Sequence, residues 1–301
     1  MTKPAIVVFA YHEIGFSCLD TLINNDEYIL AVVTHRNNPD EEIWFRSVSS
    51  LAHKYDIPVY TPETVNTQEW TDRIRGWNPE LIFSFSYRDR FSEDIIKLPR
   101  LGAFTMHDSL LPKYRGGDSI NRAVQNGEQE TGVTLHTAAT NSNAGDIVDQ
   151  ERVAIGVDDT AEDVYRKCAK AASVVLERRI EEITAGSAPR TPQDESQATV
   201  FDAMKPDDCR IDWTQTAEAI YNLIRATTHP FPGAFTSAES KRLFVWWAKP
   251  LPSQGGTPGQ VLSQDPLIIA TGSGALELLN AEWEEDDDAD VHLNEGQILG
   301  S

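Results

Sequence analysis

Residues 103–112 read AFTMHDSLLP, and residues 113–116 continue the chain with KYRG. The apolar residues before His107 are typical of a buried strand, and the Ser-Leu-Leu-Pro segment after it is typical of a turn. In open α/β sheets, ligands bind outside the carboxyl ends of the strands. We therefore expect the residues after Phe104 to lie at the mouth of a sheet and not in its core.

The segments before this stretch alternate between two patterns. Continuous apolar runs, as expected for strands covered on both faces, occupy residues 5–10, 28–34 and 81–85, and a shorter run holds Val59 and Tyr60. Helical patterns lie between them at residues 15–25, 42–55 and 67–77. Strands that alternate with helices predict an α/β fold with a Rossmann-like, mostly parallel sheet and right-handed crossovers.

The second half of the chain changes character. A helix is expected at 117–125, strands at 132–137 and 147–153, and a long amphipathic helix at 160–185, before a polar, proline-containing linker at 187–198. A helix at 214–227 and a turn at 230–234 then precede short strands at 243–247, 259–262, 267–270 and 275–280. Short strands with Gly and Pro turns suggest a small β-barrel, which here would be OB-like. We predict two domains, at 1–190 and 200–301.

Composition narrows the class of protein. The 301 residues carry a formal net charge of −21, which opposes non-specific attraction to nucleic acid. No apolar run reaches the roughly 20 residues that span a bilayer, and we expect neither a signal peptide nor a membrane partner. The three cysteines, at widely spaced positions, are expected to be reduced and buried, as in a cytoplasmic protein. No metal site is expected, because ligand types do not cluster at a zinc spacing.

Several further motifs follow in a recognisable order: FSFSYR at 83–88, NGEQETGVTLH at 126–136, NAGDIV at 143–148, RIDW at 210–213 and PFPGA at 230–234. Together with the opening stretch, they resemble the folate-dependent formyltransferase family over nearly the whole chain. The resemblance is to the group that includes the UDP-4-amino-4-deoxy-L-arabinose and methionyl-tRNA formyltransferases. It implies an enzyme that transfers a formyl group from 10-formyltetrahydrofolate to an amine, with an amino sugar nucleotide as acceptor, and a homodimer.

The catalytic positions of the family are only partly kept. The family uses Asn, His and Asp; His107 matches the His, whereas Thr105 and Asn143 stand at the other two positions. A Thr hydroxyl has one donor proton, and an Asn amide orients an imidazole without stabilising its charged form. Asp108 and Asp146 are the candidates for supplying the missing charge.

The resemblance also implies binding residues. The cofactor-binding candidates are Asp89, Arg90, Phe91, Gly117, Ala139, Thr140, Asn141 and Ser142, and Gly117 stands where close relatives carry an Arg. The substrate-binding candidates are Tyr87, Lys113, Tyr114 and Arg115. His136 lies in an expected strand and is interpreted as structural. Altered acyl or one-carbon chemistry, and a non-catalytic nucleotide- or folate-binding relative, remain alternatives because of Thr105 and Asn143.

Overall fold

The chain divides into two structural units. The computed structural model describes residues 3–37, 42–141, 143–238, 241–252, 255–284 and 290–300. The first unit comprises residues 1–119, 130–154 and 164–201, and the second comprises 120–129, 155–163 and 202–301. Residues 187–198, which read as a linker in the sequence, therefore belong to the first unit.

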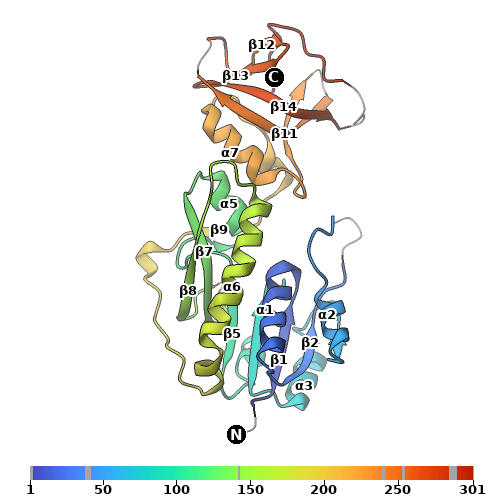
Figure 1. Ribbon diagram of the computed structural model, residues 1–301, viewed down its shortest axis with the longest axis vertical. Helices are drawn as coiled ribbons and strands as arrows, with labels where there is room; N and C mark the ends of the chain where they lie inside the picture. The colour runs from blue at the N-terminus through green and yellow to red at the C-terminus, as the bar shows by residue number, and fades with distance from the viewer. Residues whose placement is uncertain are drawn as a thin grey trace. The chain divides into compact units, whose positions relative to one another are not determined.

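A seven-stranded sheet forms the centre of the first unit, with the order β3-β2-β1-β4-β5-β7-β8 (Figure 1). Its strands are β1 (Ile6–Ala10), β2 (Ile29–Val33), β3 (Val59–Tyr60), β4 (Leu81–Phe85), β5 (Ala103–His107), β7 (Glu130–Thr137) and β8 (Ile147–Ala154). The strands from β1 to β5 run parallel, whereas β7 pairs antiparallel with β5 and with β8. The mostly parallel sheet confirms the predicted fold class.

Helices cover both faces of this sheet. The helices are α1 (His12–Asn24), α2 (Val48–Lys54), α3 (Gln68–Trp77), α4 (Glu93–Ile96) and α6 (Ala161–Thr184). Helix α5 (Ser119–Gln125) belongs to the second unit except for its first residue. The Ser173 hydroxyl of α6 donates to the Ser17 carbonyl of α1 at 3.3 Å, and both helices lie in front of the sheet in Figure 1. On the other face, Ile74 of α3 and Ile95 of α4 pack with Phe9 in one buried cluster. Coverage on both sides explains why β1 and β4 are apolar throughout.

Among the late-starting helices, α2 begins furthest from its predicted position. Helix α2 starts at Val48 instead of residue 42, with the Ser47 side chain accepting from the Ser50 amide at 3.1 Å as an N-cap. Just before it, the Arg46 amide donates to a Glu13 carboxylate oxygen at 3.0 Å, and the Arg46 Nε donates to the other at 2.8 Å. These contacts hold the chain outside a helix as far as Ser47.

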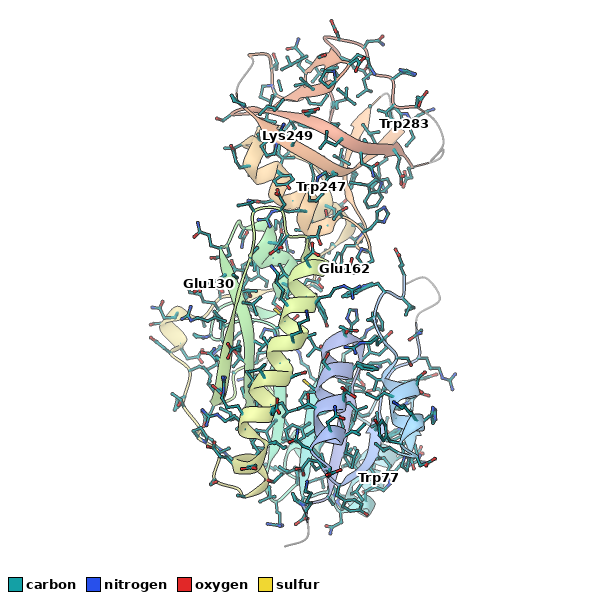
Figure 2. The ribbon with its side chains drawn as sticks, in the orientation of Figure 1. Trp77, Glu130, Glu162, Trp247, Lys249 and Trp283 are labelled. Atoms are coloured by element: carbon teal, nitrogen blue, oxygen red, sulfur yellow. The ribbon has the colours of Figure 1, made fainter. Side chains whose placement is uncertain are left out.

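Aromatic side chains close the end of α3 against the sheet. The Trp77 ring, labelled in Figure 2, lies 5.0 Å from the Tyr60 ring of β3. Asn78 ends the helix in the left-handed conformation (φ 51°), which Asn tolerates better than most residues. The terminus of α3 is therefore fixed by packing and by backbone geometry together.

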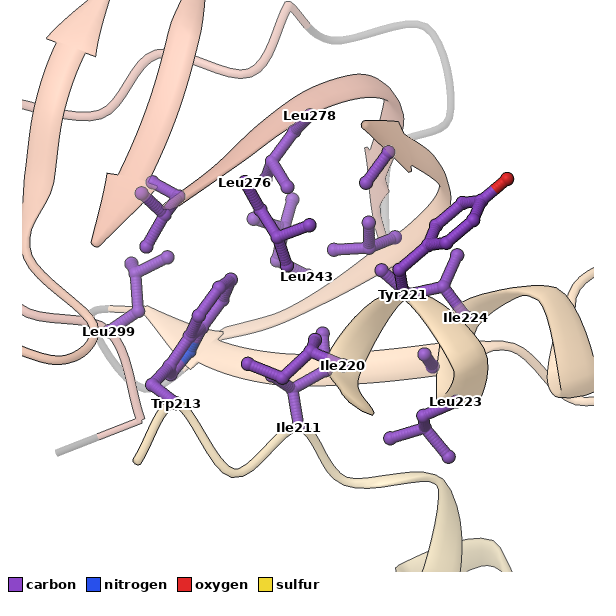
Figure 3. Packing of buried hydrophobic residues seen from close by; sticks show 14 of the residues in the cluster. Ile211, Trp213, Ile220, Tyr221, Leu223, Ile224, Leu243, Leu276, Leu278 and Leu299 are labelled. Atoms are coloured by element: carbon purple, nitrogen blue, oxygen red, sulfur yellow. The ribbon is translucent and has the colours of Figure 1, made fainter. Parts of the chain in front are cut away.

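The second unit is built on a five-stranded antiparallel sheet with the order β10-β11-β14-β13-β12. Its elements are η2 (Pro206–Cys209), α7 (Ala217–Thr227), β10 (Ala234–Ala238), β11 (Lys241–Leu251), β12 (Val261–Gln264), β13 (Leu267–Ala270) and β14 (Ala275–Trp283). Figure 3 shows Trp213, Ile220, Leu243 and Leu276 in the core that α7 forms with the sheet. The turn predicted at 230–234 leads straight into β10, which the sequence patterns missed. Closure of this sheet into an OB-like barrel stays a prediction.

Three short elements complete the first unit. Strands β6 (Arg115–Gly116) and β9 (Val200–Phe201) pair in parallel, and η1 (Glu195–Gln197) precedes β9. All three cysteines are buried and free, as expected. Within the described ranges, no helix has both the length and the apolar character that a membrane span requires.

Candidate active site

A row of three polar residues crosses the middle of the central sheet. Ser84 of β4 is the register partner of Thr105 of β5, and Thr105 is the partner of His136 of β7. Register partners on neighbouring strands point to the same face. All three residues line one pocket of about 100 Å³. This row forms the polar floor of the pocket.

Two loops form the walls of this pocket. Its other lining residues are Tyr87, Arg88, Asp89, Arg90 and Phe91 after β4, and Ala138, Ala139, Asn141 and Asn143 after β7. Most of the predicted cofactor-binding residues are thus brought together with Thr105, although they come from segments about fifty residues apart. Thr140 and Gly117 are not among the residues that line it, and Ser142 lies outside the described residues.

The pocket wall formed by residues 87–91, after β4, is held in place by packing and hydrogen bonds to neighbouring segments. The Tyr87 ring stacks on His35 at 4.1 Å, and Phe91 packs edge-on against Phe9 at 4.6 Å. The Asp89 carboxylate accepts from the Val65 amide at 3.2 Å. Burial, followed by the charge of Asp89, raises the pKa of the Tyr87 phenol, so Tyr87 stays protonated. The exposed guanidinium groups of Arg88 and Arg90 bring positive charge to the pocket.

His107 is buried at the carboxyl end of β5, two residues beyond Thr105 and so on the same face of the strand. Its Nε2 lies 2.8 Å from the Tyr114 carbonyl oxygen. Since a carbonyl only accepts, Nε2 must carry a proton. Nδ1 lies 3.4 Å from a carboxylate oxygen of Asp108. In the neutral ring, Nδ1 is therefore the atom that takes up a proton, next to a negative charge.

The two candidate carboxylates differ in position. Asp108 faces His107, as described above, and its side chain is 26% exposed. Asp146 instead forms hydrogen bonds through its backbone. Its amide donates to the Thr137 hydroxyl, and its carbonyl accepts from the Thr137 amide, both at 2.9 Å. The geometry places the charge of Asp108, not that of Asp146, beside the imidazole.

The predicted substrate-binding turn is held by contacts of its own. Tyr114 has a positive φ of 56°, and its ring stacks on Phe201 at 5.1 Å. The Lys113 carbonyl accepts from the Ser109 hydroxyl at 2.7 Å. This strained turn presents the Tyr114 carbonyl to His107, and none of its residues lines the pocket.

Arg115 is buried and fully engaged by two side chains. Its guanidinium makes a two-fold contact with Glu195, at 2.8 and 2.7 Å, and donates to the Gln193 side-chain oxygen at 3.1 and 2.7 Å. The amide nitrogen of Gln193 in turn donates to the carbonyls of Asn143 and Gly145, both at 2.7 Å. Gln193 thus joins the turn after His107 to the loop that carries Asn143.

Two histidines near the strand ends are held neutral. Burial, followed by the charge of His107, lowers the pKa of His136 to about 4, and burial followed by Arg88 lowers that of His12 to about 4. In the unfolded chain these two side chains take up protons near pH 6.5, whereas in the folded chain they do so only near pH 4. The part of the unfolding free energy that comes from keeping these two histidines neutral is therefore fully present above pH 6.5, and it is lost as the pH falls towards 4.

This linkage gives a measurable expectation. Between pH 7 and 4.5, His136→Gln should lose about 2 kcal/mol less unfolding free energy than the wild type, because one histidine no longer titrates. Urea unfolding of both proteins at the two pH values tests this, and the carboxylates common to both cancel in the difference. Equal losses in the two proteins would contradict it.

Sequence reasoning did not identify six residues of this region: Ser84, Arg88, His136 and Ala138, which line the pocket, and Gln193 and Glu195, which hold Arg115. His136 was interpreted as structural because a single sequence does not show which strand lies beside residues 132–137. A Thr in one expected strand and a His in another become informative only once β5 and β7 are known to pair. Gln193 and Glu195 lay in what read as a linker.

Solved structures with the same fold include two types of formyltransferase. An N-formyltransferase from Helicobacter canadensis, in complex with folinic acid and dTDP-3-aminofucose, matches with a TM-score of 0.68 and 21% identity, over 92% of this chain and 99% of that chain. Methionyl-tRNA formyltransferase from Clostridium thermocellum matches with a TM-score of 0.59 and 18% identity, over 82% of this chain and 93% of that one.

A longer protein shares the fold as well. HypX from Aquifex aeolicus matches with a TM-score of 0.66 and 18% identity over 94% of this chain, which spans only 45% of HypX. At these identities the likeness concerns the fold alone.

Family models cover most of the sequence. The formyl transferase model matches residues 5–180, and the model for the formyl transferase C-terminal domain matches residues 203–294. The first match includes the whole pocket floor and His107, and the second includes the five-stranded sheet. The chain therefore belongs to the formyl transferase family, a family of one-carbon transferases, as its sequence motifs predicted.

Proposed function

We propose that this chain transfers the formyl group of 10-formyltetrahydrofolate to the amine of an amino sugar nucleotide. One observation carries the proposal: the two loops that the resemblance assigns to the donor meet in one pocket, whose floor includes Thr105. Family membership supports the reaction type. The Helicobacter canadensis enzyme, bound to folinic acid and a dTDP-amino sugar, supports the donor and acceptor classes.

The pocket fits one part of such a donor. A volume of about 100 Å³ is below the roughly 300–1,000 Å³ of pockets that enclose drug-sized ligands, so a single ring system would enter. Polar floor atoms suit the hydrogen-bonding edge of that ring. The guanidinium groups of Arg88 and Arg90 suit carboxylates that remain outside. A net charge of −21 favours a small nucleotide over tRNA as the acceptor.

In this proposal, His107 accepts a proton during the transfer and Thr105 stabilises the negative charge that develops. The bound donor would supply the formyl carbon that the amine attacks. His107 takes the amine proton at Nδ1, since Nε2 already donates to Tyr114. The Thr105 hydroxyl would donate to the formyl oxygen as negative charge develops there. The bond between the formyl carbon and N10 of the donor would then break, and the proton held by His107 would pass to N10, so that tetrahydrofolate leaves and the formylated amine remains. The 3.4 Å between Nδ1 and a carboxylate oxygen of Asp108 is longer than a charge-assisted hydrogen bond, and this distance should shorten once Nδ1 carries the proton.

Asp108 replaces the charge that Asn143 lacks. Asp108→Asn is expected to lower kcat about 10- to 100-fold, because the imidazolium of His107 loses its carboxylate partner. Steady-state kinetics with a formylated-product assay measures this loss. Donor affinity should not change, because Asp108 does not line the pocket.

Asp146→Asn is the matched control for this substitution. Its backbone contacts are kept, and its side chain is not placed at the imidazole. Loss of activity in Asp146→Asn with full activity in Asp108→Asn would reverse the assignment of the two carboxylates.

The function itself is tested in two steps. Calorimetry with 5-formyltetrahydrofolate measures donor binding, and mass spectrometry of a panel of UDP- and dTDP-amino sugars incubated with 10-formyltetrahydrofolate detects the formylated product. Binding together with product formation supports the proposal. Binding without product from any amino sugar indicates a non-catalytic folate-binding relative or a different acceptor. Absence of binding by folded protein excludes the folate donor and turns attention to altered one-carbon chemistry.

A further inference from the structure

His136 carries a buried nitrogen atom that no described residue satisfies. The side chain is 2% exposed, and its Nε2 has no hydrogen-bond partner among the described residues. Native proteins leave few buried polar atoms unpaired, and each such atom calls for an explanation. Since the residue also lines the pocket, a ligand there is the natural partner.

The tautomer of His136 defines what that partner must be. Nδ1 lies 2.8 Å from the Thr137 carbonyl oxygen, which only accepts, so Nδ1 carries the proton. In the neutral ring, Nε2 is then a bare acceptor. It can bind an N–H or O–H group, whereas it repels a carbonyl oxygen or an oxyanion.

The surroundings of His136 keep it in this neutral form. Burial is the main cause that lowers the pKa of His136 to about 4, and the charges of His107 and Arg115 act in the same direction, against the smaller opposing effect of the hydrogen bond to the Thr137 carbonyl. A base with so low a pKa is poorly matched to proton transfer near neutrality. The residue therefore serves recognition, and His107 remains the group that moves protons.

Its place in the sheet adds a complementary neighbour. Thr105, the register partner of His136, presents a hydroxyl that can donate on the same floor. One donor and one acceptor thus stand side by side, and a ligand that brings an oxygen to one must bring an N–H to the other. This pairing orients the ligand in the pocket.

We infer that His136 Nε2 is a specificity-determining acceptor for the one-carbon donor, binding an N–H group of its reduced pterin-type ring system and directing the formyl oxygen towards Thr105. The inference rests on the proposed function, because it takes the pocket as the site of a reduced folate. It assigns to His136 a role in ligand choice and orientation that the sequence patterns did not suggest.

Two substitutions separate this role from a structural one. His136→Met keeps the volume and removes the acceptor, whereas His136→Gln keeps an acceptor near the position of Nε2. Calorimetry with tetrahydrofolate at pH 7 should give a dissociation constant about tenfold higher for the Met variant than for the wild type. The Gln variant should stay within about threefold of the wild type. Thermal melting of all three proteins checks that they are folded.

The pH dependence provides a second readout. Near pH 4, protonation turns Nε2 into a donor, so the ratio of wild-type to Gln-variant affinity should fall about twofold between pH 7 and 4, while ligand titration cancels in the ratio. Equal affinity of the wild-type and Met proteins, both folded, would overturn the inference and leave the proposed function standing. No tetrahydrofolate binding by the wild type would instead overturn the proposed function.

Discussion

His107→Gln is expected to reduce kcat/KM for formyl transfer by about 10²- to 10⁴-fold, the range typical of a lost general acid–base group. Glutamine can still donate to the Tyr114 carbonyl, which His107 Nε2 contacts at 2.8 Å, so the strained turn at Tyr114 keeps its partner. Glutamine cannot take a proton from the attacking amine. The loss should therefore appear in kcat, while the affinity for 5-formyltetrahydrofolate remains unchanged.

The control for this substitution is His53→Gln, which makes the same chemical change at an exposed position on α2. Initial rates of product formation and donor calorimetry on the three proteins provide the comparison. Retention of more than about a tenth of wild-type activity by folded His107→Gln would remove His107 from the proton-transfer role.

Gly145→Ala is expected to destabilise the protein by about 3 kcal/mol and to abolish donor binding. A Cβ at this position would overlap the carbonyl oxygen of Thr137 and lie 2.7 Å from its carbonyl carbon and its hydroxyl oxygen. These are backbone and hydrogen-bonded atoms of β7 and cannot rotate away. The loop that carries Asn143 must therefore move off the strand, and with it one wall of the pocket.

Gly76→Ala is the opposite case and serves as its control. Gly76 lies inside α3, and nothing stands within 4 Å of the position that a Cβ would take. A Gly-to-Ala change in a helix interior should stabilise by about 0.5–1 kcal/mol. In denaturant unfolding, the free energy of unfolding should therefore fall for Gly145→Ala and rise for Gly76→Ala, relative to the wild type. Similar shifts for both variants would contradict the packing argument.

The sequence predicted the strands of the sheet well because each carries its own signal. The apolar runs that became β1, β2 and β4 are buried on both faces, and that burial is visible as continuous hydrophobicity. His107 was found because a local motif surrounds it. The start of α2 was wrong by several residues, since it depends on Glu13, a residue of another helix that binds Arg46.

The pocket floor could be predicted only in part, because pairing between strands is a long-range property. Thr105 was identified through its place in a motif. His136 acquires meaning from its register opposite Thr105, across an antiparallel pair in a sheet that is otherwise mostly parallel. Neither alternation nor composition shows that register. The missed β10 has a similar cause, since it is defined by its partner β11.

The chain between α6 and β9 has a consequence for protein engineering. Polar segments rich in Pro and Ser are the usual places to insert a tag, exchange a loop or join two proteins. Here the Thr191 amide and carbonyl both bond to Ile147 at 2.8 Å, and Gln193 reaches two backbone carbonyls of the pocket loop while also holding Arg115. Because these hydrogen bonds hold the loop that carries Asn143 in place, an insertion or fusion in this stretch is expected to disturb the candidate site, and fusions should be made elsewhere.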